Sequence, residues 1–428
     1  MWSTNSPLRA GIAAVFALVA NIDAADAQVS SPSLTLGDAL ERAATDNHLL
    51  RAAELRIGEA SGQLTQAAVW LVDNPELAAS GGRRTDPDGV DAFDREYEIG
   101  IEQRFEIGGQ RGGRKRVAEA GLEATRARAS DVGRVVALAT SLAFHESLAA
   151  RERVELAERT EDLAGQLHDL ARRRLDVGEG TPLELNAAAV RLAEARRLRL
   201  AAQARHDTLL LRLRRLIGSE PDEPVTLVGA LPDSSPPVFT DDIVARAVEA
   251  RPDLRAAVHQ VDAAAAGVSL AGARAWPDVT LGALVAREEG DEVLRAGIRV
   301  PLVLFNRNQG NRATAEAARE RAVVEQEGLV LTVVTEARSA ALAYEQARAA
   351  LDVYDADVLV ALEESAALVQ LAAEAGELSI ADVLVVQREL IDGLGGYVDA
   401  RLSLATARAR LLAAASLPQT TDLFEEDR

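Results

Sequence analysis

Apolar residues recur every three or four positions along most of the chain, which is the spacing of an amphipathic α-helix. The longest such stretch covers residues 312–374 and holds no proline and a single glycine, Gly328. At about 1.5 Å per residue, one helix of that length extends for roughly 90–95 Å. A comparable helix is predicted over residues 114–176. Elements this long indicate an elongated protein rather than a globular one.

Both long helices are followed by turn residues and a second helical stretch, so each is predicted to form an antiparallel hairpin. After the longer helix, Gly376 suits a left-handed C-cap, and Ser379 suits the N-cap of a helix over residues 380–416. After the other, Thr181 is the predicted N-cap of a helix over residues 182–217.

A different period appears between the helices. Tyr97, Ile99 and Ile101 lie at alternate positions, as they would in a half-exposed β-strand. A further helix is predicted over residues 36–72, ahead of this strand. Two β-hairpins are predicted, over residues 76–83 with 94–106 and over residues 278–287 with 292–305.

The order of helix, strand pair and helical hairpin occurs twice. Arg42 matches Arg246 at an offset of 204 residues, and the tip residues Gly178 and Gly376 match at an offset of 198. Landmarks that stay in order with so little drift indicate an internal duplication. The predicted division is a first repeat over residues 34–217, a linker over 218–239, a second repeat over 240–418 and a polar tail over 419–428.

The first 27 residues form a separate segment. Arg9 supplies a positive charge, residues 10–20 are a short apolar run, and Ala25-Asp26-Ala27 has the small residues of a cleavage site. These features predict a secretory signal peptide over residues 1–27, with a short buried helix as the alternative. No later run of about 18 apolar residues occurs, so no transmembrane helix is predicted.

The composition of the chain argues against several classes of function. Aromatic residues make up only 3% of the 428 residues, and the formal net charge of −20 disfavours a nucleic-acid partner. Cysteine is absent and the five histidines are scattered, so no metal-ligand cluster, cofactor site or thiol chemistry is predicted. No nucleophile elbow or phosphate-binding loop occurs, and the chain is not expected to be an enzyme.

Four predicted strands per chain are too few to enclose a lumen, which takes about eight. Left open, the sheet would keep two exposed edges. Strands of about 10 residues are long enough to cross a bilayer when they are tilted. In an exported chain without transmembrane helices, we therefore expect several copies to close one barrel in an outer membrane.

The sequence resembles the TolC family of outer-membrane efflux ducts over residues 34–418. The resemblance rests on the tandem repeat, the two strand pairs, the Gly-x-x-[Ser/Thr]-x-x-[Asp/Glu] tips and the run Ile-Ala-Asp-Val-Leu at residues 380–384. Residues 301–310, Pro-Leu-Val-Leu-Phe-Asn-Arg-Asn-Gln-Gly, are similar to the strand-to-helix junction of the branch that serves heavy-metal exporters of the cobalt–zinc–cadmium type.

This resemblance implies a mainly α fold with a small β part. Three copies would form a homotrimer whose twelve strands make one transmembrane β-barrel and whose twelve helices make an α-barrel tunnel in the periplasm. The duct would conduct substrate passively, with heavy-metal cations as the expected cargo. Its implied partners are a periplasmic adaptor protein, an inner-membrane resistance–nodulation–division pump and outer-membrane lipid.

The family docks its adaptor at the hairpin tips. The matching residues of this sequence are Val177, Gly178, Thr181, Ala375, Gly376 and Ser379. Glu184 and Asp382 are the candidates for an acidic gate or selectivity ring at the periplasmic end. Val385, one turn further on, is apolar where some family members carry a second acid. The alternative role of Glu184 and Asp382 is to complement the dipoles of their helix N-termini.

Two rival functions stay open at this stage. Helical hairpins also occur in periplasmic adaptors and coiled-coil scaffolds, which have no pore, although these usually carry one hairpin flanked by compact β-domains. The same duct could also serve drugs or other organic solutes instead of metals.

Overall fold

The computed structural model describes residues 33–84, 94–234, 240–288, 291–354 and 378–420, together with single positions and pairs between 358 and 372. The predicted signal peptide at residues 1–27 lies outside the described residues. So do the tip residues Ala375 and Gly376 and most of the predicted C-terminal tail.

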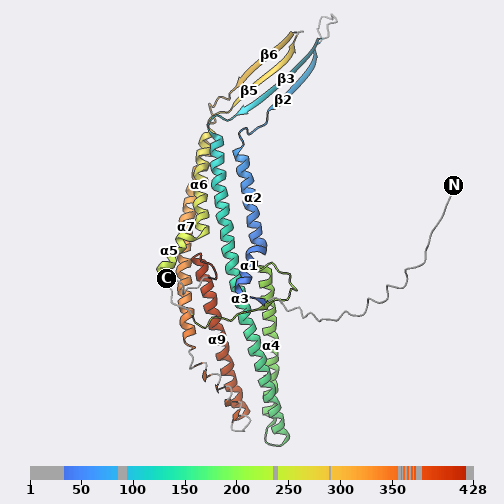
Figure 1. Ribbon diagram of the computed structural model, residues 1–428, viewed down its shortest axis with the longest axis vertical. Coiled ribbons are helices and arrows are strands. Elements are labelled where there is room, and N and C mark those ends of the chain that lie inside the picture. The colour runs from blue at the N-terminus through green and yellow to red at the C-terminus, as the bar shows by residue number, and fades with distance from the viewer. Residues whose placement is uncertain are drawn as a thin grey trace, which may run out of the picture.

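A four-stranded sheet occupies one end of the molecule, and a bundle of long helices extends away from it (Figure 1). The helix α3 (Gln110–Asp176) has 67 residues, which corresponds to roughly 100 Å, and runs from the sheet to the far end. There the chain turns back as α4 (Pro182–Leu216). The second hairpin is formed by α7 (Gln309–Asp352) and α9 (Ile380–Ala414). The single helix predicted over residues 312–374 is wrong, because α7 ends at Asp352 and a turn follows at residues 353–354. Between 358 and 372 only single positions and pairs are described.

The shorter elements follow the same order in each half of the chain. In the first half they are α1 (Leu36–Asp46), α2 (His48–Ala68), β2 (Glu76–Arg84) and β3 (Asp94–Phe105). In the second half they are α5 (Thr240–Ala250), α6 (Pro252–Ala273), β5 (Val279–Glu288) and β6 (Asp291–Arg299). The sheet order is β2-β3-β5-β6 and every neighbouring pair is antiparallel, so the two hairpins form one continuous sheet.

The single helix predicted over residues 36–72 is wrong in two respects. It is interrupted at Asn47, whose side chain accepts a hydrogen bond from the backbone N–H of Leu49 at 2.9 Å and so caps α2. The Asn47 amide also donates to the carbonyl of Leu216 at 2.8 Å, which ties the break to the end of α4. The second helix then ends at Ala68, ahead of the predicted end at residue 72.

Both long helices begin earlier than predicted. The helix α3 begins at Gln110 because Gly109, with φ of 80°, supplies the left-handed turn. Gly113 is therefore inside the helix, where a Cβ atom would lie 3.0 Å from Leu270 of α6, so the glycine permits close helix packing. In the second half Asn308, with φ of 58°, makes the equivalent turn before α7.

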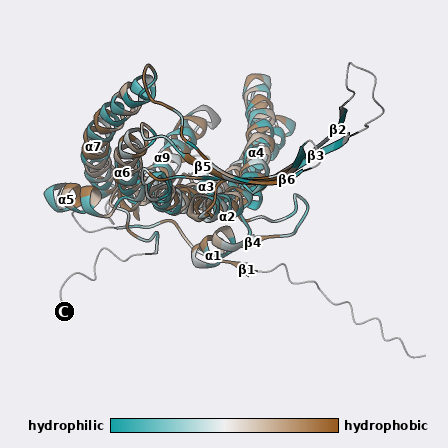
Figure 2. Ribbon diagram, turned by 90° about the horizontal axis from the view of Figure 1, so that it is seen from above, coloured by the Kyte–Doolittle hydropathy of each residue, from teal (hydrophilic) through white to brown (hydrophobic). Residues whose placement is uncertain are grey.

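Two local predictions about strands also differ from the structure. The strand β6 ends at Arg299 rather than at residue 305, and the following residues lead irregularly into α7. The predicted linker contains a short strand, β4 (Thr226–Leu227), which pairs in parallel with β1 (Ser33–Leu34). These strands lie beside α1 on one side of the helical body (Figure 2).

The core is thin and rich in alanine, and it lies where the short helices cover the long ones. One cluster joins α1, β1 and β4 to α3, α4 and α9 through residues such as Phe144 and Leu213. A second joins α5 and α6 to α7 and α9 around Tyr344, whose side chain is fully buried. Small side chains let the helix axes approach, so packing along the bundle replaces a large central core.

Arg401 of α9 connects the inter-repeat linker to both halves of the bundle. Its guanidinium forms an ion pair of 2.9 Å with Glu152 of α3 and donates to the carbonyl of Leu231 at 2.6 Å. A further ion pair of 2.7 Å joins it to Asp233. Arg401 is 9% exposed, so these partners compensate the cost of removing its charge from water.

A small cavity of about 150 Å³ lies beside this linker, and His145 of α3 is one of its walls, with Arg408 and Gln419. Burial, and next the positive charge of Arg408, lower the pKa of His145 to about 4. No described residue hydrogen-bonds its Nδ1. The folded protein therefore holds this imidazole neutral well below neutral pH.

Replacing Arg401 by alanine should lower the free energy of unfolding by about 3 kcal/mol, because Glu152 and the Leu231 carbonyl lose their partner. Arg388→Ala on the same helix is the matched control, since the Arg388–Asp392 pair is largely exposed and should contribute less than about 1 kcal/mol. Thermal unfolding followed by far-ultraviolet circular dichroism measures both. Equal losses in the two variants would contradict the role given to Arg401.

Acidification should destabilise the protein through His145. Between pH 6.5 and 4 the unfolded chain binds a proton that the folded protein does not, so stability falls as pH drops through this window. From pH 7 to pH 5 the loss from this group is about 2 kcal/mol. Denaturant midpoints at the two pH values should differ less in His145→Gln than in the wild type. An unchanged difference in the variant would refute the prediction.

Candidate channel wall and hairpin tips

The two faces of the sheet carry different side chains. Residues that are directly opposite in neighbouring strands lie on the same face, so the strand register assigns every side chain to a face. One face is apolar over most of its length and the other is mostly charged.

The apolar face is built from large aliphatic residues on all four strands. Its main members are Leu77, Ile99, Ile101, Leu281, Val285, Leu294 and Ile298, and all of them are exposed. Leu294 and Ile298 of β6 have 77% and 73% of their surface accessible. An apolar sheet surface of this size, uncovered within the described part of the chain, indicates contact with something other than water.

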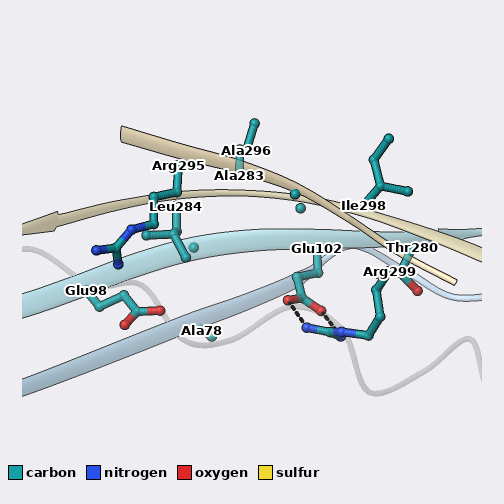
Figure 3. Close-up of a pocket in the computed structure, with 13 residues that line it drawn as sticks. Ala78, Glu98, Glu102, Thr280, Ala283, Leu284, Arg295, Ala296, Ile298 and Arg299 are labelled. Atoms are coloured by element: carbon teal, nitrogen blue, oxygen red, sulfur yellow. Dashed lines mark hydrogen bonds and ion pairs between the residues drawn. The ribbon is translucent and has the colours of Figure 1, made fainter. Parts of the chain in front are cut away.

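The opposite face carries ion pairs between strands. Arg299 of β6 binds Glu102 of β3 through both guanidinium ends, at 2.8 and 2.9 Å (Figure 3). Arg295 binds Glu288 in the same bidentate manner, with both distances 2.7 Å. This face is hollowed by a groove of about 420 Å³, in which Glu98 and Leu284 also take part. Figure 3 shows Ile298 pointing to the other side of the sheet.

Aromatic side chains mark both ends of the apolar face. Tyr97 lies at the end far from the helices. At the helical end, Trp70 and Trp276 follow α2 and α6 and are 73% and 65% exposed. Phe305, in the irregular segment after β6, is 92% exposed. Exposed aromatics at two levels are typical of the two interfaces of a membrane.

At the opposite end of the molecule, the tip of the first hairpin is a tight turn. The helix α3 ends at Asp176 with Val177 as its C-cap, and Gly178 adopts φ of 83°. The backbone N–H groups of Glu179 and Gly180 both donate to the carbonyl of Arg174, at 2.8 and 2.9 Å, which satisfies the helix end. Val177 is 72% exposed, so the tip presents an apolar side chain to solvent.

Both candidate acids take part in helix capping. Glu184 and Thr181 form a capping box, in which the Thr181 N–H donates to Glu184 Oε2 at 2.8 Å. The Ser379 hydroxyl donates to Asp382 Oδ2 at 2.6 Å and accepts from the Asp382 N–H. The capping role of both acids is therefore present in the structure.

The turn of the first hairpin and the start of α9 lie at the same end of the molecule (Figure 1). A shared apolar cluster contains Ala171 and Ala188 of the first hairpin with Val383 of the second. The tip residues Val177, Gly178, Thr181 and Ser379 are thus brought to one end, together with Glu184 and Asp382.

Within the described residues, no group of three or more His, Asp or Glu is arranged to hold a metal ion. In the same part of the chain, none of the helices has the length and apolar character required to span a bilayer.

The ion pairs on the charged face of the sheet are not predicted by the sequence pattern. The alternation of Tyr97, Ile99 and Ile101 identified the apolar positions. The intervening positions of the same strand include Glu98 and Glu102, so this period of two contained the signal. The alternating pattern of β3 does not specify its neighbours in the sheet, and the order of the strands is what places Arg299 near Glu102.

Comparisons with known proteins agree with this arrangement. The chain is 28% identical over 370 residues to the cobalt-zinc-cadmium resistance protein CzcC of Cupriavidus metallidurans, covering 85% of this chain and 86% of CzcC. It is 29% identical over 301 residues to the nickel-cobalt-cadmium resistance protein NccC of Alcaligenes xylosoxydans xylosoxydans, covering 70% and 66%.

Among solved structures, CusC, described in connection with transmembrane channel formation, superposes with a TM-score of 0.73 at 20% identity. The match covers 89% of this chain and 91% of CusC. The resemblance to TolC-type ducts and the expected mainly α fold with a small β part are both confirmed. The outer membrane efflux protein family matches residues 39–219 and 243–416, which is most of the sequence. The chain therefore belongs to the outer membrane efflux protein family and is located in the outer membrane.

Proposed function

We propose that three copies of this chain join their sheets edge to edge into one closed, twelve-stranded barrel. In the described part of the chain, β2 and β6 each have a neighbouring strand on one side only. In lipid no water can bind the backbone groups of those open edges. Pairing β6 of one copy with β2 of the next satisfies these groups, and rotational symmetry closes the ring. The resemblance to TolC-type ducts supports a count of three.

The single observation that carries this proposal is the division of the sheet into an apolar and a charged face. In a closed barrel the apolar face contacts lipid and the charged face surrounds an aqueous lumen. Tyr97 then lies near one membrane interface, and Trp70 and Trp276 lie near the other.

Below the barrel, the long helices of the three copies form a tunnel through the periplasm. The chain supplies a passage and no energy, because nothing in its sequence resembles a catalytic or nucleotide-binding site. A resistance–nodulation–division pump in the inner membrane drives the solute, and a periplasmic adaptor joins the pump to the tunnel. The adaptor docks on the tips, where Val177 is exposed beside the turn at Gly178. Thr181, Ala375, Gly376 and Ser379 belong to the same proposed docking surface.

The proposed cargo is a heavy-metal cation. CzcC and NccC carry cobalt, zinc, nickel and cadmium resistance in their names, and the match to each covers most of this chain. Glu184 and Asp382 place negative charge at the tunnel entrance, and three copies of each would attract cations there. Capping uses each carboxylate as a hydrogen-bond acceptor, so capping and cation attraction are compatible.

Deleting the gene should make cells more sensitive to cobalt, zinc or cadmium salts, and the wild-type chain should restore tolerance. The minimal inhibitory concentration of each salt measures this. Sensitivity that appears only toward drugs or dyes would reject metal cargo and favour a duct for organic solutes.

The electrophoretic mobility of the outer-membrane fraction separates the duct from a scaffold without a pore. A duct should run as an SDS-resistant oligomer that heating converts to the monomer, because closed barrels resist detergent. A water-soluble monomer would overturn the barrel and favour an adaptor or coiled-coil scaffold.

Val177→Asp should weaken adaptor binding several-fold and lower metal tolerance, because a charge then replaces the exposed apolar side chain at the tip. Co-purification of the adaptor with the oligomer measures the binding. Val135→Asp, at an exposed position of the same helix about 60 Å away, should bind the adaptor normally. If both variants form the oligomer and bind the adaptor equally, the tip is not the docking surface.

A further inference from the structure

The arginines on the charged face of the sheet are held in place by carboxylates. Arg295 and Arg299 each make two hydrogen bonds to one glutamate, a geometry that fixes the whole guanidinium plane. Arg104, at the helical end of the same face, is bound by Asp73 at 2.5 Å and by Asp278. The described positive charges of this face are therefore each paired with a carboxylate.

Acids outnumber arginines among the described side chains of this face. The register places six acids there, Glu76, Glu96, Glu98, Glu102, Glu288 and Asp291, against three arginines, Arg104, Arg295 and Arg299. The excess is three negative charges per chain. In the proposed trimer these charges repeat around the axis at equal heights.

Of the two acids that line the groove, Glu98 is the one to which no described arginine donates a hydrogen bond. It is exposed near the middle of β3, and it interacts with Arg295 through its charge without a hydrogen bond to any described residue. Its neighbours across the strands are Ser80 and Ala286, which are too small to cover it. Figure 3 shows Glu98, Leu284 and Arg295 on one side of the sheet.

We propose that Glu98 sets a preference for cations inside the barrel, as a second selective level far from the hairpin tips. This inference rests on the proposed barrel and deepens it, because it names hydrated cations as the solute class that the outer part of the duct favours. Charges of one sign on a wall of low dielectric constant raise the local concentration of the opposite ion. The bidentate pairs of Arg295 and Arg299 engage Glu288 and Glu102, so Glu98 is the acid of the groove that a passing ion meets without a hydrogen-bonded arginine.

The absence of cysteine from the chain permits a test that does not depend on whether the tunnel entrance is open. A cysteine introduced by Leu284→Cys lies on the charged face, opposite Arg295 and close to Glu98. The full-length protein in outer membranes is treated from outside with two methanethiosulfonate reagents of similar size, one carrying trimethylammonium and one carrying sulfonate. The ratio of their reaction rates reports the local potential.

Adding Glu98→Gln to Leu284→Cys should lower the cation-to-anion rate ratio by roughly two-fold. Adding Arg295→Gln should raise the ratio, because Glu98 and Glu288 then lose a counter-charge. Glu292→Gln is the matched control, since this glutamate lies on the opposite face of the sheet, and should leave the ratio unchanged. Glu98→Asp should keep most of the wild-type ratio.

The inference is overturned if Glu98→Gln and Arg295→Gln change the rate ratio no more than the control Glu292→Gln does. That result would leave the proposed duct unaffected. A different result would reject the barrel itself. If Leu284→Cys reacts with neither reagent and Ala283→Cys, on the apolar face, reacts with both, the charged face does not line a lumen.

Discussion

The hydrogen bonding of the sheet edges is the constraint on which the rest of this structure depends. Four antiparallel strands satisfy each other internally but leave one side of β2 and one side of β6 open. In water such edges can be solvated, whereas beside lipid each unpaired backbone group costs several kcal/mol. The apolar face of the same sheet makes lipid its natural surroundings. Within the described residues, the outer edges of β2 and β6 therefore need strands from another copy of the chain to pair their backbone groups.

The helical body meets a different requirement. It must be long, hollow when assembled and narrow in cross-section, and aromatic residues are correspondingly rare. Alanines at the contacts let α3, α4, α7 and α9 pack closely without a wide core, and the short helices α1, α2, α5 and α6 cover them only in the upper half. Arg401 of α9 binds both the linker between the repeats and Glu152 of α3, so it connects the two repeats to each other.

The sequence alone was sufficient where the determinants are local. Thr181 and Ser379 were predicted as caps because a hydroxyl residue, followed by an acid three positions later, binds backbone within its own turn. The strand around Ile99 was predicted correctly because alternation of apolar and polar residues can be recognised within a single stretch of sequence. The mainly α class followed from the same kind of pattern.

Sequence reasoning failed where the determinant lies far along the chain. The break at Asn47 depends on Leu216, and the pairing of β1 with β4 joins segments almost 200 residues apart. Gly113 lies outside the helix predicted over residues 114–176, although in the structure it is part of α3 and lets α6 approach. The ion pair of Glu102 with Arg299 joins residues of the two repeats, and no local period specifies it.

One consequence follows from the length of α3. A single helix without a break runs from Gln110, shortly after the strand end at Phe105, to Asp176 beside the turn. A twist applied to the lower end of α3 is therefore transmitted along the helix toward the base of the sheet. Through α3, the two ends of the molecule are mechanically coupled.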